Sequence, residues 1–184
     1  MEKRIDPIWE EVDKEVFTDR EDTLAYLDWW AGKIPVGQMC LAFQSQRRMG
    51  KTAILRRFCN CLFWAQGPVI PFYFQVPPED LLLAELNEAY YCAFVQQYAA
   101  FLLRQPELAR QKIERVEQLL PLVEATGHEP LQQDVRRYFN YPPDRQGRKW
   151  SDFVAGAPYR FAQGEEVLFF AVVLESSGLY DPDR

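Results

Sequence analysis

The sequence predicts an α/β domain, in which helices flank a parallel sheet. Two compact apolar runs, residues 39–43 and 167–174, are as short as strands that are buried on both faces. A third run, residues 69–76, is rich in residues that favour strands. Apolar residues at helical spacing fill most of the segments between these runs, and 184 residues that are 48% hydrophobic suffice for one domain with a core.

The first third of the chain predicts the order helix, strand, loop, helix. Residues 19–30 carry acidic residues early and apolar residues at helical spacing, which predicts a short amphipathic helix. The strand at 39–43 is followed by a polar loop at 44–49. A second amphipathic helix is predicted over residues 53–63. Its polar side is expected to carry Arg56, Arg57 and Asn60.

Two strands and a helical region make up the rest of the chain. Pro71 lacks the N–H group that a strand donates, so the strand at 69–76 is expected at an edge of the sheet. The strand at 167–174 is the best candidate for a central position. Between them we expect a hairpin of two long helices over 79–105 and 106–120. A short helix over 131–139 follows the hairpin, and then a helix over 151–161 that is capped by Ser151 and is either kinked or ended early at Pro158.

The loop before the second helix has the pattern of a phosphate-binding loop, GxxxxGK(S/T). The window Ser45-Gln46-Arg47-Arg48-Met49-Gly50-Lys51-Thr52 matches it at three of the four fixed positions, with Ser45 in place of the first glycine. In such a loop the Gly50 backbone approaches phosphate oxygens, Lys51 reaches the β- and γ-phosphates and the Thr52 hydroxyl binds Mg²⁺. From Ala53 onward the helix aims its N-terminal N–H groups at the anion.

Two blocks of the sequence resemble the archaeal-type ATPases, P-loop proteins related to the AAA+ and STAND NTPases. Residues 17–24, Phe-Thr-Asp-Arg-Glu-Asp-Thr-Leu, are similar to the F-x-x-R-E-x-x-L box of that family, and residues 47–55 resemble its R-R-x-G-K-T-x-L-L loop and helix. The resemblance implies that Phe17 and Arg20 lie near the adenine of a bound nucleotide. It also implies that ATP and Mg²⁺ are the cofactors.

The resemblance also implies a catalytic pair, which this sequence has only in part. In the family, a second strand ends in Asp-Glu, of which the aspartate helps to hold Mg²⁺ and the glutamate polarises the attacking water. Here Leu174 stands at the aspartate position and Glu175 at the glutamate position. Glu175 is therefore either a catalytic residue or an ordinary charged residue at the end of a strand. We expect ATP hydrolysis to be weak or absent.

Further strands that the family places after this point have no counterpart here, so the sequence predicts one incomplete domain. On this interpretation residues 1–184 are the N-terminal portion of a P-loop nucleotide-binding domain with a helical hairpin insertion, ended early by truncation. The alternative is a non-catalytic interaction protein, or a degenerate remnant of an ATPase, in which the helices over 79–120 contact a protein partner. Arg47 and Arg48 either add positive charge beside the phosphates or are solvated loop residues.

Composition limits the remaining function classes. A net charge of −6 gives no support for nucleic-acid binding through general positive potential. The charged N-terminus lacks the apolar stretch of a signal peptide, so we expect a cytoplasmic protein without a membrane segment. The four cysteines lie in apolar stretches and are interpreted as reduced core thiols, with Cys59 and Cys61 on different sides of a helix. His128 is interpreted as a loop residue.

Overall fold

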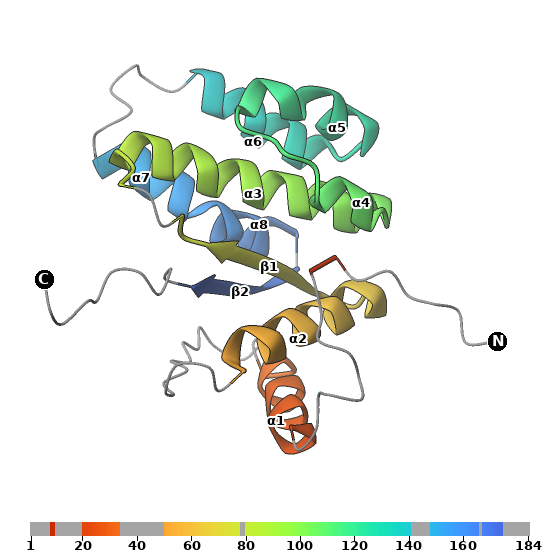
Figure 1. Cartoon of the computed structure of the whole chain (residues 1–184). Coiled ribbons are helices and arrows are strands. Elements are labelled where there is room, and N and C mark those ends of the chain that lie inside the picture. Colours follow the sequence, from red (N-terminus) through yellow and green to blue (C-terminus); the bar gives the residue numbers. More distant parts are fainter. Residues whose placement is uncertain are drawn as a thin grey trace, which may run out of the picture.

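The protein has three layers, with a small sheet between two groups of helices (Figure 1). The computed structural model describes residues 8–9, 20–33, 50–77, 80–140, 148–165 and 167–174. Its elements are, in chain order, α1 (Glu21–Ala31), α2 (Lys51–Ala65), β1 (Val69–Gln75), α3 (Leu83–Leu103), α4 (Pro106–Ala109), the 3₁₀ helix η2 (Val116–Leu119), α5 (Leu120–Ala125), α6 (Glu129–Asn140), α7 (Arg148–Ala155), α8 (Ala157–Glu165) and β2 (Leu168–Leu174). The α/β class predicted from the sequence is confirmed, and the predicted strand at 39–43 lies outside the described residues.

β1 and β2 pair in parallel although the whole helical region separates them in the sequence. Their register runs from Val69 opposite Leu168 to Gln75 opposite Leu174. Parallel neighbours require a crossover connection, and here α3 to α8 provide it. The described part of the chain therefore contains two of the three predicted strands, and they lie side by side.

The hydrogen bonds of β1 explain why this strand contains a proline. The Leu168 N–H donates to the Pro68 carbonyl at 3.0 Å, so the backbone groups of the even-numbered residues of β1 face β2 and those of the odd-numbered residues face away. The backbone of Pro71 faces away from β2. The N–H group that proline lacks is therefore not one that would bond to β2. Within the described residues β1 pairs only with β2, and because the predicted strand at 39–43 is not among them, the edge position of β1 stays a prediction.

A buried glutamine covers this open edge of β1. The Gln97 side chain, on α3, accepts a hydrogen bond from the Tyr73 N–H and donates one to the Tyr73 carbonyl, both at 2.9 Å. The amide of the side chain thus takes the place of a neighbouring peptide group. Because unpaired buried peptide groups are costly, this contact stabilises β1, which is buried almost throughout, on the side that faces away from β2.

Each face of the sheet has its own apolar core. On one side, α1 and α2 pack against each other and against the sheet, where they cover Val69, Tyr73 and Val172. The helix residues of this core include Leu27, Trp30, Leu55 and Phe58. On the other side, the helices of the crossover surround α3 and form the larger core. The central residues of that core are Tyr91, Phe94, Val95, Tyr98, Leu119, Leu131, Val135, Tyr138, Trp150 and Val154.

The predicted helical hairpin is wrong, because its second arm is not a long helix. α3 forms as predicted, but α4 ends at Ala109, and helical structure resumes only at η2. The Gln96 side chain, buried on α3, donates to the carbonyls of Leu108 and Gln111 at 2.6 and 2.8 Å. These bonds satisfy one carbonyl within α4 and one just after its end, so tertiary contacts override the local helical spacing.

The helices near the end of the crossover also differ from the prediction. A break at Gly156 separates α7 from α8, and Pro158 lies in the first turn of α8, where proline is tolerated. Ser151 lies within α7 and does not cap it; its hydroxyl accepts a hydrogen bond from the Asn87 side chain at 2.9 Å. One predicted helix with a kink is therefore two helices.

Asn60 is buried rather than on the polar side of α2 as predicted. Its carbonyl oxygen accepts hydrogen bonds from the N–H groups of Ile8 and Trp9 at 3.0 and 3.1 Å, and its amide nitrogen donates to the Trp9 carbonyl at 2.9 Å. The Ile8 side chain reaches the larger core. Asn60 thus attaches residues 8–9 to α2. Because the contact uses backbone groups of these residues, their side chains do not predict it.

Candidate phosphate-binding site

α2 begins directly after a glycine that adopts a backbone conformation unfavourable for other residues. Gly50 has φ 76° and ψ 14°, in the left-handed region, and its carbonyl accepts the first helical hydrogen bond from the Ile54 N–H at 3.0 Å. A Cβ at this position would meet no atom within 4 Å, so the requirement for glycine is conformational rather than steric. The glycine of the predicted phosphate loop is therefore explained by the turn into α2.

The N-terminus of α2 offers backbone donors and a lysine in one place. Lys51 is the first residue of the helix and is half-buried, while Thr52 is exposed and Ala53 is half-buried. Because the N-cap residue is glycine, no side-chain oxygen at that position caps the first turn. A helix N-terminus carries a partial charge of about +0.5, so this end of α2 attracts anions.

The start of α2 lies at the edge of the sheet where ligands bind in α/β proteins. Figure 1 shows the N-terminal end of α2 on the same side as the arrowheads of β1 and β2. Arg56, in the second turn of α2, donates from Nε to the Tyr73 hydroxyl near the end of β1 at 3.3 Å. Open α/β sheets bind ligands beyond the carboxyl ends of their strands, and Gly50, Lys51 and Thr52 lie at that end of the sheet.

The structure describes only some of the site residues predicted from the sequence. Gly50, Lys51, Thr52 and Ala53 come together at the start of α2. Arg20 is half-buried directly before α1, the helix that packs on α2. The other predicted positions lie outside the described residues, namely Phe17, Ser45, Gln46, Arg47, Arg48, Met49 and Glu175.

Gly50→Ala is expected to lower the free energy of unfolding by about 1–2 kcal/mol, because an L-residue is strained at this positive φ. Gly67→Ala is the matched control, since a Cβ there also meets no atom within 4 Å and no left-handed φ is required. Urea denaturation of the two variants measures the difference. Equal stability of both variants would contradict the conformational role of Gly50.

The Mg²⁺ position stays a prediction, and other metal, cysteine and histidine chemistry can be followed in the described residues. Among them, no group of three His, Cys, Asp or Glu side chains could hold a metal ion. Cys59 is buried and Cys61 is exposed, as the prediction of different helix sides requires, and burial raises the pKa of the Cys92 thiol to about 12. His128 lies in the turn before α6, and its Nδ1 accepts a hydrogen bond from the Leu131 N–H at 3.3 Å.

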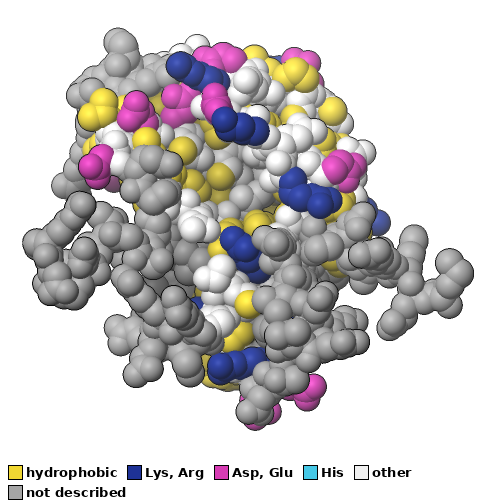
Figure 2. Space-filling view, viewed as in Figure 1, with side chains coloured by type: hydrophobic (Ala, Val, Ile, Leu, Met, Phe, Trp, Pro, Cys, Tyr) yellow, Lys and Arg dark blue, Asp and Glu magenta, His cyan; other side chains and the backbone are white. Residues whose placement is uncertain are grey.

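On the side seen in Figure 2, the Lys and Arg side chains of the described residues do not form one continuous patch. There the Lys and Arg side chains of the described residues are scattered and interleaved with acidic ones. A surface that follows a phosphate backbone needs a basic stripe or patch. In the described part of the chain, moreover, no helix combines the length and the apolar character needed to cross a membrane.

Sequence reasoning missed a polar cluster that joins α3, α6 and α8. Asp134 on α6 is buried and receives hydrogen bonds from the Tyr91 hydroxyl at 2.8 Å and from Nε and Nη2 of Arg160 at 3.0–3.1 Å. The Arg160 guanidinium also donates to the Phe153 carbonyl and lies over the Phe153 ring, 4.1 Å from its centroid. Burial and then the Asp134 carboxylate raise the pKa of the Tyr91 hydroxyl, which stays protonated as a donor.

No sequence signal could have found this cluster, because its members are far apart in the chain and each resembles an ordinary helix residue. Asp134 is 43 residues from Tyr91 and 26 from Arg160.

Comparison of the chain with models of known protein families, with curated proteins and with solved structures gave no match. The resemblance to P-loop ATPases therefore depends on the motif residues, and the geometry at the start of α2 is the observation on which a function can be proposed.

Proposed function

We propose that this protein binds ATP with Mg²⁺ at the N-terminus of α2. The observation that carries the proposal is the left-handed Gly50 directly before Lys51 and Thr52, at the carboxyl edge of a parallel sheet. In this arrangement the N–H groups of the first turn and the Lys51 ammonium hold the phosphates, and the Thr52 hydroxyl binds Mg²⁺. Ser45, Gln46, Arg47, Arg48 and Met49 complete the loop, and Phe17 and Arg20 contact the adenine end.

Hydrolysis of ATP is proposed to be slow or absent. Phosphoryl transfer to water requires a group that positions the water and charges that stabilise the transition state, in addition to binding. β2 ends at Leu174, whose hydrocarbon side chain cannot bind Mg²⁺. Glu175 is then the remaining carboxylate at the end of β2 that could polarise a water molecule.

Lys51→Ala is expected to weaken ATP–Mg²⁺ binding at least about tenfold, because it removes a charge-assisted contact to phosphate. Isothermal titration calorimetry of the wild type and the variant measures the affinity. Lys112→Ala is the matched control, since it removes the same charge at an exposed position in the loop after α4 and should leave binding unchanged. Absence of binding by folded wild-type protein, or equal binding by both variants, would contradict the proposal.

An interaction protein is the second candidate function, and exposed apolar side chains favour it. Tyr26 and Trp29 on α1 stack at 5.8 Å and are 47% and 54% exposed, and Leu82 before α3 is 65% exposed. Exposed apolar residues that lie together are typical of protein interfaces. If folded wild-type protein fails to bind ATP–Mg²⁺, this candidate takes precedence.

A further inference from the structure

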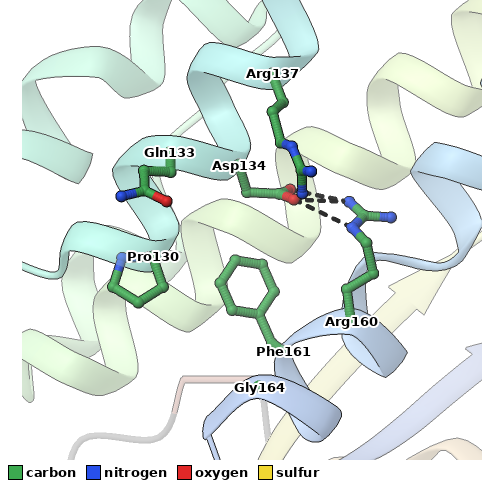
Figure 3. Close-up of a pocket in the computed structure, with 7 residues that line it drawn as sticks. All are labelled: Pro130, Gln133, Asp134, Arg137, Arg160, Phe161 and Gly164. Carbon is green, nitrogen blue, oxygen red and sulfur yellow. Dashed lines mark hydrogen bonds and ion pairs between the residues drawn. The ribbon is translucent and has the colours of Figure 1, made fainter.

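A small pocket between α6 and α8 combines a flat apolar floor with arginine side chains (Figure 3). Its volume is about 180 Å³, and it is lined by Pro130, Gln133, Asp134, Arg137, Arg160, Phe161 and Gly164. Pockets for drug-sized ligands usually measure roughly 300–1,000 Å³, so this one suits a smaller group, of the size of one side chain, and does not suit a nucleotide. None of the residues that line this pocket belongs to α2, so the pocket is separate from the proposed phosphate site.

One charged group of the pocket is fixed and neutralised. Arg160 is held by the bidentate contact to Asp134 and by its position over the Phe153 ring. Because the Asp134 carboxylate is engaged by Arg160 and by the Tyr91 hydroxyl, it balances the charge of Arg160 and is not available to Arg137 as an equal partner. This ion pair therefore forms a rigid wall of the pocket.

Arg137 supplies the remaining charge of the pocket. It is exposed on α6, and the described residues form no ion pair with it. Figure 3 shows Arg137 and Arg160 converging beside Asp134 from two different helices. Two guanidinium groups against the single carboxylate of Asp134 leave the lining with a net charge of +1. Such a pocket attracts an anion, and a guanidinium fork matches a carboxylate in geometry.

The surroundings select a singly charged ligand with an apolar part. Glu129 lies one turn before Gln133 and accepts a hydrogen bond from its Nε2 at 3.1 Å, so the negative charge of Glu129 beside the lining disfavours a doubly charged phosphate. Pro130 and the small accessible part of Phe161, which is 4% exposed, offer apolar surface beside the arginines. Gly164 has no side chain to close that end of the pocket.

We infer that this pocket binds a carboxylate attached to a small apolar or aromatic group, with Arg137 holding the carboxylate and Phe161 contacting the apolar part. The source of such a group is either a small aromatic acid or the C-terminal residue of a peptide. Both present the same chemistry to the pocket, so the probes below distinguish them. The inference does not depend on nucleotide binding at α2.

The test is a titration of ¹⁵N-labelled full-length protein followed by NMR. Benzoate is expected to shift amide signals of α6 and α8 saturably, whereas benzamide, which lacks the charge, is not. N-acetylphenylalanine and its amide form the second pair of probes. Tighter binding of benzoate than of N-acetylphenylalanine identifies a small acid as the ligand class, and the opposite order identifies a peptide C-terminus.

Two neighbouring arginines provide matched variants. Arg137→Gln is expected to weaken benzoate binding at least about tenfold, as the loss of a charge-assisted hydrogen bond implies. Arg136→Gln removes the same charge from the same helix, outside the pocket lining, and should leave binding unchanged. Lys51→Ala should also bind benzoate normally. Absence of saturable shifts at α6 and α8, or equal weakening by both arginine variants, would overturn the inference.

Discussion

Replacing Asp134 with alanine lowers the free energy of unfolding by about 3–5 kcal/mol, the loss that follows when one partner of a buried ion pair is removed. The variant leaves the Arg160 guanidinium without its carboxylate and the buried Tyr91 hydroxyl without its acceptor. The Arg160 side chain keeps 28% of its surface exposed, so partial hydration places the expected value toward the lower end of this range. Urea denaturation at neutral pH measures the effect.

A double variant separates the loss of the ion pair from the loss of packing. Arg160→Met alone also destabilises the protein, because it leaves the Asp134 carboxylate buried and unpaired. Asp134→Leu combined with Arg160→Met removes both charges, and its loss of stability is expected to be smaller than the sum of the losses in the single variants Asp134→Leu and Arg160→Met. Additive effects of the two substitutions would show that the charges do not stabilise each other.

Gln97→Leu is expected to lower the free energy of unfolding by about 2–5 kcal/mol. The leucine fills a similar space but leaves the N–H and the carbonyl of Tyr73 buried without partners, and each such group costs about 1–3 kcal/mol. Gln163→Leu on α8 is the matched control, because Gln163 is exposed and its side chain donates a hydrogen bond to the hydroxyl of the exposed Tyr159. Its stability should change by no more than about 0.5 kcal/mol.

The same variants test how the open edge of β1 is protected. A strand with unpaired backbone groups can recruit another strand, so Gln97→Leu should also increase self-association at concentrations where the wild type is monomeric. Analytical ultracentrifugation of the Gln97→Leu and Gln163→Leu variants measures this. Equal stability and equal association of both variants would show that Gln97 does not protect the edge.

The parts of the fold that follow from local patterns could be predicted from the sequence. The strands at 69–75 and 168–174 are bounded by turn-forming residues, and the edge position predicted for the first one depends on Pro71 alone. The helix predicted over 53–63 is present as α2, which begins two residues earlier, directly after the Gly50 N-cap. These features depend on residues that are close together in the chain.

The parts that depend on distant partners could not be predicted. Asn60 appears as one more polar residue of an amphipathic helix, and only the fold brings the backbone of Ile8 and Trp9 to it. Gln96 and Gln97 are neighbours in α3. The sequence of this helix does not indicate that Gln96 bonds the backbone near α4 and that Gln97 bonds the backbone of β1. Single buried amides that bond backbone groups leave no periodic pattern, so sequence reasoning has nothing to detect.

The central claim, that the N-terminus of α2 holds the phosphates of ATP, is tested most directly by the backbone amide signals of Gly50, Lys51, Thr52 and Ala53. In ¹⁵N-labelled protein titrated with ATP and Mg²⁺, these four signals should shift together and saturably, and Lys51→Ala should weaken the response at least about tenfold. Amide signals of α2 that stay unchanged while the folded protein is titrated to millimolar ATP, or shifts confined to other helices, would contradict the claim.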